Sequence, residues 1–341
     1  MCQRPSAGLL HSRTMKKVLL LNMGGTLGMQ GAPLSPGDYG HKLVERVPEL
    51  ASLAELEIRS VCNLDSSDVG PEQWAELVTI IADRSGPPAD GIVILHGTDT
   101  MAFTAAALAF GLEGLDRPVV LTGAQRPLVA HRTDARRNLV DAVELATCDI
   151  PEVGICFDGL LLRGCRAIKG DARSYHAFES PGVEPLARMG FDIDIGAHVR
   201  RSSATFRGDG RFDSRVAVVY VTPGLEPSVV EAMLESDVPP RGLILAAYGV
   251  GTAPRLTRAI APVVRRAIDG GTEVVVVTQR GGLIDLELYE NSRALADAGA
   301  VPGGQMRIEA ATVKMMQALA RFPDHVSRRR WLTTDVAGEL R

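Results

Sequence analysis

Two short segments combine glycine with hydroxyl side chains directly after apolar runs. They are Met23-Gly24-Gly25-Thr26-Leu27, after the run 18–21, and His96-Gly97-Thr98-Asp99-Thr100, after the run 92–95. Each pattern is typical of a buried strand that ends in a turn, and ligands of open parallel sheets bind outside the carboxyl ends of the strands. We therefore expect Thr26, Thr98 and Asp99 to converge on one site. Such a site would suit an enzyme that uses a hydroxyl group as its nucleophile.

Each segment also has a simpler interpretation. A Gly-Gly-Thr turn can be an ordinary turn or a phosphate-binding loop, although residues 24–28 lack the full Gly-x-Gly-x-x-Gly spacing of a dinucleotide site. Thr98 and Asp99 could cap a following helix, because both side chains accept hydrogen bonds from free helix amides. Asp65-Ser66-Ser67-Asp68 could be a turn before a helix, or Ser66 could hold the carboxylate of a small ligand.

Lys169 is the candidate activating group. It stands in Arg166-Ala167-Ile168-Lys169-Gly170-Asp171-Ala172, after a strand-like stretch over 153–162 and before residues with a helix-like pattern. Most lysines are solvated surface residues. A lysine beside a threonine can instead lower the pKa of the hydroxyl or take its proton, and a threonine is a poor nucleophile without such help.

Composition limits the classes of function. The chain has 341 residues, of which 45% are hydrophobic and 23% charged, enough for two domains with a substantial core. A net charge of −4 and a pI near 6.0 give no reason to expect nucleic-acid binding. No apolar run approaches the roughly 18 residues of a membrane helix. Five cysteines, at spacings that fit neither a zinc site nor a disulfide framework, indicate reduced thiols in a cytoplasmic protein.

Short apolar runs alternate with helical patterns through the first half of the chain. Strands are predicted at 17–22, 56–62, 91–95, 118–122 and 153–157, and helices at 71–84, 100–114 and 133–146. This alternation favours a mostly parallel sheet covered by helices on both faces. Continuous apolar strands favour the same arrangement.

The polar stretch 199–215 interrupts this pattern and is interpreted as a linker. A second α/β pattern follows, with strands predicted at 216–221, 242–247 and 273–278 and helices at 226–236, 255–269, 290–298 and 307–321. The prediction is an α/β protein with a larger domain over 15–198, which holds the threonines, and a smaller domain over 216–341. Residues 1–14 lack the apolar stretch of a signal peptide and are expected to be a disordered extension.

Several motifs occur together in a fixed order along the chain. They are Asn22-Met23-Gly24-Gly25-Thr26-Leu27-Gly28-Met29, Leu64-Asp65-Ser66-Ser67-Asp68, Leu95-His96-Gly97-Thr98-Asp99-Thr100-Met101-Ala102-Phe103-Thr104, Leu121-Thr122-Gly123-Ala124-Gln125-Arg126-Pro127-Leu128 and Tyr248-Gly249-Val250-Gly251-Thr252-Ala253-Pro254. In this combination the chain resembles the bacterial-type L-asparaginases, and most closely the cytoplasmic type I enzymes, from Lys16 to about Ala320. The resemblance implies a two-domain asparaginase-like fold and hydrolysis of L-asparagine to aspartate and ammonia.

The resemblance also implies roles for individual residues. Thr26 matches the nucleophile of the family, and the second catalytic group is matched by Thr98, Asp99 and Lys169. Ser66 matches a contact to the substrate carboxylate, and Ser67 and Asp99 would help to hold the amino acid end. Gly25 leaves room for the ligand, and backbone amides near Gly97 and Thr98 would stabilise the oxyanion. No metal or organic cofactor is implied, and the expected assembly is a homodimer or homotetramer in which Tyr248–Thr252 of a neighbouring copy adds to the site.

The chain departs from the family at the loop that follows the first threonine. The family usually supplies a tyrosine there, whereas residues 29–38 contain none and the nearest is Tyr39. Met23 stands where the family usually has threonine, and could simply face the core. Two other functions stay open: a non-catalytic amino acid-binding protein on the same scaffold, and the amidase subunit of a tRNA-dependent amidotransferase. The sequence leaves the preference between asparagine and glutamine undetermined.

Overall fold

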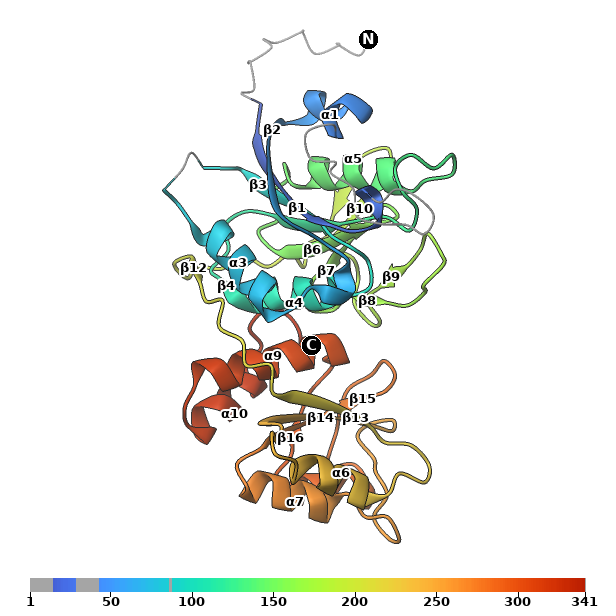
Figure 1. The fold of residues 1–341 in the computed structure, drawn as a ribbon, viewed down its shortest axis with the longest axis vertical. Coiled ribbons are helices and arrows are strands. Elements are labelled where there is room, and N and C mark those ends of the chain that lie inside the picture. The colour runs from blue at the N-terminus through green and yellow to red at the C-terminus, as the bar shows by residue number, and fades with distance from the viewer. Residues whose placement is uncertain (1–14, 29–42, 86–87, 341) are drawn as a thin grey trace, which may run out of the picture.

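The computed structural model describes residues 15–28, 43–85 and 88–340, which fold around two separate sheets (Figure 1). The larger sheet has eight strands in the order β11-β10-β7-β6-β5-β3-β1-β2. Its strands are β1 (Lys17–Gly24), β2 (Glu55–Leu64), β3 (Gly91–Leu95), β5 (Val119–Thr122), β6 (Val153–Phe157), β7 (Leu160–Arg163), β10 (Ala187–Met189) and β11 (Ile193–Ile195). The five strands from β2 to β6 are parallel, and the strands from β7 to β11 extend the sheet in antiparallel fashion.

Helices cover both faces of this sheet. Those of the larger domain are α1 (Leu43–Arg46), α2 (Leu50–Leu53), α3 (Pro71–Ala82), α4 (Met101–Gly111) and α5 (Ala135–Leu145). Alternate residues of β3 pack on opposite sides: Ile92 and Ile94 belong to the core beneath α3 and α4, and Val93 to the core beneath α2 and α5. Burial on both faces is why β3 and β6 are apolar throughout and β5 is apolar up to Thr122.

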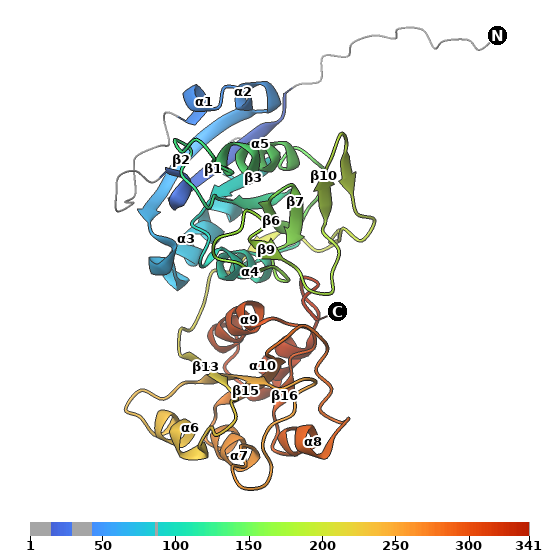
Figure 2. The ribbon, with the colours of Figure 1, turned by 90° about the vertical axis from the view of Figure 1, so that its right-hand side faces the viewer.

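The smaller sheet consists of four parallel strands in the order β13-β14-β15-β16. These strands are β13 (Val216–Tyr220), β14 (Gly242–Ala247), β15 (Glu273–Thr278) and β16 (Val301–Pro302), and the accompanying helices are α6 (Pro227–Leu234), α7 (Ala261–Asp269), α8 (Glu290–Asp297), α9 (Ile308–Arg321) and α10 (His325–Thr333). Helix α9 contacts both α4 and the smaller sheet, and lies between the two domains (Figure 2). The predicted fold class, two α/β units with the larger sheet mostly parallel, is confirmed.

Three predicted elements differ from the structure. The strand-like stretch 153–162 is a hairpin of β6 and β7, because Asp158 and Gly159 both have positive φ and form the two-residue turn that joins antiparallel strands. The helix predicted over 255–269 begins only at Ala261, where Pro262 fits the first turn. The helix-like residues after Lys169 form bends and irregular backbone instead.

The segment interpreted as a linker, 199–215, contains a short strand of its own. This strand, β12 (Arg207–Gly208), pairs in antiparallel fashion with β4 (Leu112–Glu113), which directly follows α4. The connection therefore runs along the larger domain before β13 begins. Residues 1–14, predicted to be an extension, lie outside the described residues.

Candidate functional site

The three motif loops emerge from neighbouring parallel strands. In the sheet β1 lies between β2 and β3, and its residues Asn22 and Gly24 stand opposite Leu95 of β3 and Leu64 of β2. The loops that leave these strands therefore begin side by side at the carboxyl edge of the sheet. This is the convergence that the sequence predicts.

Two glycines let these loops touch. A Cβ atom on Gly25 would lie 2.4 Å from the backbone nitrogen of Gly97, and Gly25 has a φ of +89°, which L side chains rarely adopt. A Cβ atom on Gly97 would lie 2.7 Å from both Cβ and Oγ of Ser66. No other residue type fits at either position without moving the neighbouring loop, so the close contact of the three motifs depends on glycine.

Lys169 reaches this edge from a separate two-stranded ribbon. It ends the short strand β8 (Ile168–Lys169), which pairs with β9 (Phe178–Glu179). Its Nζ donates to Thr98 Oγ1 at 2.8 Å and to Asp99 Oδ1 at 2.6 Å. The lysine side chain is only 15% exposed, whereas that of Asp99 is 66% exposed. Lys169 is thus a paired residue of the site rather than a solvated surface lysine.

The helix-cap interpretation of Thr98 and Asp99 is wrong. Helix α4 begins at Met101, and its N-cap residue is Thr100, whose hydroxyl donates to Ser66 O at 2.5 Å. The side chains of Thr98 and Asp99 instead contact Lys169. A lysine between a hydroxyl and a carboxylate can polarise the hydroxyl while the carboxylate holds the ammonium group in place.

Gln125 is a further residue of the site, to which the sequence alone assigned no role. It follows β5, the next strand of the sheet, and its Oε1 accepts a hydrogen bond from Thr98 Oγ1 at 3.3 Å. Its Nε2 donates to the carbonyl oxygens of Ser174 and Asp171, at 3.0 and 3.4 Å. These two bonds fix which end of the amide faces Thr98. The signal was its place after an apolar strand, the same pattern that identified the threonines.

The Asp65–Asp68 segment is both a turn and part of the site. Asp65 caps the short 3₁₀ helix η3 (Ser66–Asp68), and its Oδ1 accepts from the backbone nitrogen and the Oγ of Ser67, which lowers the pKa of this carboxyl. Ser66 is buried, and its Oγ accepts from the backbone nitrogen of Asp99 at 3.3 Å. Ser66 therefore lies against the Thr98–Asp99 loop, whereas the Ser67 hydroxyl serves the turn.

Thr26 begins the 3₁₀ helix η1 (Thr26–Gly28), directly after the glycine that contacts Gly97. The carbonyl oxygen of Leu27 accepts from Leu128 N at 3.1 Å, which ties η1 to the loop that follows β5. Met23 is buried in the core, as the sequence allowed. The loop over 29–42, with Tyr39, lies outside the described residues.

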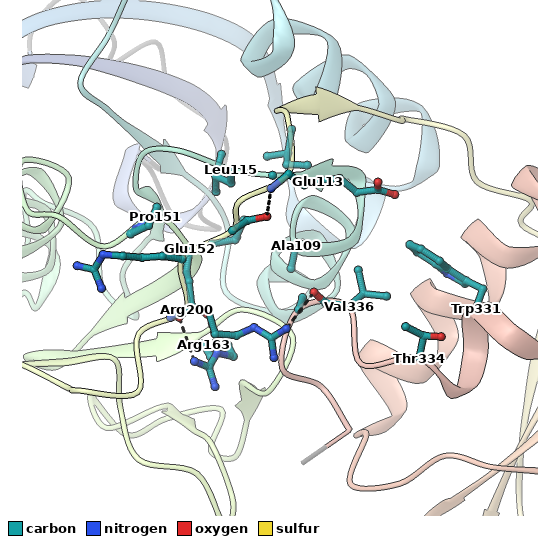
Figure 3. A pocket seen from close by; sticks show the side chains of 17 residues that line it. Ala109, Glu113, Leu115, Pro151, Glu152, Arg163, Arg200, Trp331, Thr334 and Val336 are labelled. Carbon is teal, nitrogen blue, oxygen red and sulfur yellow. Dashed lines mark hydrogen bonds and ion pairs between the residues drawn. The ribbon is translucent and has the colours of Figure 1, made fainter.

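A separate cavity of about 370 Å³ lies between the two domains (Figure 3). It is lined by Leu115 and Pro151, which precede β5 and β6, and by Trp331 of α10, so it opens at the opposite edge of the sheet from the threonine motifs. Its charged groups have ion-pair partners: Arg163 bonds Glu152 through two nitrogens, and Arg200 pairs with Asp335 at 2.9 Å. Because none of the candidate site residues lines it, we regard this cavity as a gap at the domain interface and not as the substrate site.

Within the described part of the chain, no group of three or more His, Cys, Asp and Glu side chains could hold a metal ion. In the same residues, no helix is long and apolar enough to cross a membrane. The four cysteines described, Cys62, Cys148, Cys156 and Cys165, are free thiols. Burial raises the pKa of each of these thiols, which keeps them in the unreactive protonated form.

Comparisons with known proteins cover both domains. Residues 17–202 match the family "Asparaginase, N-terminal", and residues 215–332 match the "Glutaminase/Asparaginase C-terminal domain". The chain is 35% identical to L-asparaginase 1 of Escherichia coli (strain K12), with 95% of this chain and 98% of that protein covered. It is 31% identical to a Glutamyl-tRNA(Gln) amidotransferase subunit of Pyrococcus horikoshii, with 95% and 76% covered. The crystal structure of L-asparaginase I from Vibrio cholerae superposes with a TM-score of 0.86 at 31% identity, over 96% of this chain and 100% of that one.

Proposed function

Because the chain belongs to the asparaginase family, we propose that it hydrolyses the side-chain amide of L-asparagine to aspartate and ammonia. The observation that carries this proposal is the Lys169 ammonium group, which bonds both Thr98 Oγ1 and Asp99 Oδ1 beside the Gly25–Gly97 contact. A protein that only binds an amino acid has little use for a lysine directed at a threonine hydroxyl.

The proposed reaction has two stages. In the first, the Thr26 hydroxyl attacks the amide carbon, its proton passes to the departing nitrogen, and ammonia leaves an aspartyl ester on Thr26. In the second, water attacks the ester, aspartate leaves, and the Thr26 hydroxyl is restored. Thr98, polarised by Lys169, would relay protons in both stages, and backbone amides would stabilise each oxyanion.

Substrate would be held by its amino acid end. The buried hydroxyl of Ser66 would contact the carboxylate of asparagine, and the exposed carboxylate of Asp99 would attract its ammonium group. Asp99 can serve the substrate and Lys169 together because a carboxylate has two oxygens and only Oδ1 contacts the lysine. We also propose that the protein is cytoplasmic and forms a homodimer or homotetramer. Light scattering after size-exclusion chromatography would test the oligomeric state.

Ammonia release from L-asparagine and L-glutamine by the purified chain tests the function. We expect turnover of asparagine, abolished in Thr26→Ala and retained in part by Thr26→Ser, which keeps the hydroxyl. No turnover, together with thermal stabilisation by aspartate, would support the amino acid-binding alternative. Unchanged turnover in Thr26→Ala would remove Thr26 from the mechanism.

A second candidate function is the amidase step of a tRNA-dependent amidotransferase. It is favoured by the relatives named as subunits of Glutamyl-tRNA(Gln) amidotransferase, which are nearly as similar as the asparaginases but of which the chain covers only about three quarters. The same assay separates the two. Turnover of glutamine in clear preference to asparagine would favour this second function.

A further inference from the structure

His96 is a buried histidine that the proposed reaction does not use. It stands between the end of β3 and the site, is 1% exposed, and directly precedes Gly97. Its Nδ1 lies 2.7 Å from Gly97 O, and its Nε2 lies 2.9 Å from Oγ1 of Thr104 in α4. The Trp74 indole of α3 donates to the same Thr104 oxygen at 3.0 Å. These hydrogen bonds connect Trp74 of α3, through Thr104 and His96, to the backbone carbonyl of Gly97.

The chemistry of the end groups fixes the direction of every bond. An indole N–H only donates, so Thr104 Oγ1 accepts from Trp74. A backbone carbonyl only accepts, so the proton of the imidazole is on Nδ1 and is donated to Gly97 O. In the neutral ring Nε2 is then an acceptor, so the Thr104 hydroxyl donates to it. Burial lowers the pKa of His96 to about 4, which keeps the ring neutral at neutral pH. The ring therefore has one tautomer and one orientation.

This orientation determines where the next amide group points. In a trans peptide the carbonyl and the N–H point in opposite directions. Because Gly97 O is held toward the buried His96 ring, the N–H of Thr98 faces away from that ring. Among the described residues, no acceptor forms a hydrogen bond with the nitrogen of Thr98. This N–H is therefore available to donate a hydrogen bond to a bound ligand.

We propose that His96 is a positioning residue, which locks the Gly97–Thr98 peptide so that the Thr98 N–H donates to the oxyanion formed from the substrate amide. The inference rests on the proposed function, because it assigns His96 a place in that reaction. His96 itself touches neither substrate nor the reacting atoms. Its effect is therefore expected on the rate of the chemical step and not on substrate binding.

Two substitutions of similar size test the bond to Gly97. In His96→Asn, the side-chain amide nitrogen can take the place of Nδ1 and donate to Gly97 O, whereas in His96→Gln the longer amide reaches only Thr104. We expect His96→Gln to lower kcat toward the roughly 10²–10³-fold loss that follows removal of one oxyanion donor, with KM unchanged. His96→Asn should recover most of that loss. Equal kcat in His96→Gln and the wild type, or no recovery in His96→Asn, would overturn the inference.

The wild-type protein offers a second test that does not depend on either variant folding. With ¹⁵N-labelled histidine, NMR should show one ring protonated on Nδ1 that does not titrate between pH 7 and 5. Among the described histidines this ring is identified as His96 by its burial, since residues 131, 176, 198 and 325 are exposed. A buried ring protonated on Nε2 would refute the assigned bond to Gly97. A wild type without amidase activity would instead refute the proposed function, whatever the tautomer.

Discussion

Replacing Lys169 with methionine should separate catalysis from stability. Methionine keeps most of the apolar stem and removes the two bonds of Nζ, at 2.8 Å to Thr98 Oγ1 and 2.6 Å to Asp99 Oδ1. General acid–base groups contribute roughly 10²–10⁴-fold to rate, or about 3–5 kcal/mol of the activation free energy. We expect kcat for asparagine to fall by this factor in Lys169→Met.

The same change should hardly affect the free energy of unfolding. The Asp99 side chain is 66% exposed, so water can solvate its carboxylate once the lysine is gone. Ion pairs with such an exposed partner contribute about 0–1 kcal/mol to stability. A large loss of rate with a nearly unchanged melting temperature is therefore the expected result.

Coupled-enzyme detection of ammonia measures kcat and KM, and differential scanning calorimetry measures stability. Lys17→Met is the matched control, because Lys17 is 51% exposed and 3.9 Å from its partner Glu55. It should leave both kcat and stability unchanged. A near-normal kcat in Lys169→Met would show that Lys169 has no catalytic role. A fall in melting temperature large enough to explain the lost activity would also contradict the prediction.

Two further predictions concern stability. Lys314 and Glu339 form an ion pair at 2.5 Å with both side chains 0% exposed. Glu339→Gln leaves the lysine charge buried without its partner and should lower the free energy of unfolding, measured in urea, by about 3–5 kcal/mol. The double variant Lys314→Met/Glu339→Gln should lose less, and a double variant as unstable as the single one would contradict this. His96, with a pKa lowered to about 4, takes up a proton in the unfolded chain near pH 6.5 but in the folded chain only near pH 4. Stability should therefore fall as pH drops through this window, by up to about 1.4 kcal/mol per pH unit, and a wild type with the same pH slope as His96→Asn would refute the assignment.

The parallel part of the fold was predictable because its strands are buried on both faces. Continuous apolar runs such as those of β3 and β6 have few other interpretations when helical patterns lie between them. The antiparallel extension was missed, since its strands are short and partly exposed. The turn at Asp158-Gly159 was nevertheless a readable hairpin signal.

The sequence indicates which edge of the sheet the motif residues share, but not the contacts between them. Thr98 and Asp99 follow an apolar strand and Ser66 follows β2, and these positions indicate a shared carboxyl edge of the sheet. The bond between Gln125 and Thr98 joins residues from different loops, and its existence depends on distances that no local pattern encodes. The same holds for Lys169, whose strand belongs to a two-stranded ribbon apart from the main sheet.

The two sides of the site are supported in different ways. Thr98 and Ser66 follow parallel strands, so the core of the larger domain fixes them. Lys169 follows a turn whose residues are tied to the end of the smaller domain: Cys165 Sγ donates to Ala337 O at 3.2 Å, and Arg166 Nη1 donates to Glu339 O at 3.1 Å. The carboxylate of Glu339 is in turn paired with Lys314 of α9. Lys169 therefore follows a turn that contacts both domains, although its own strand pairs with β9 of the larger domain.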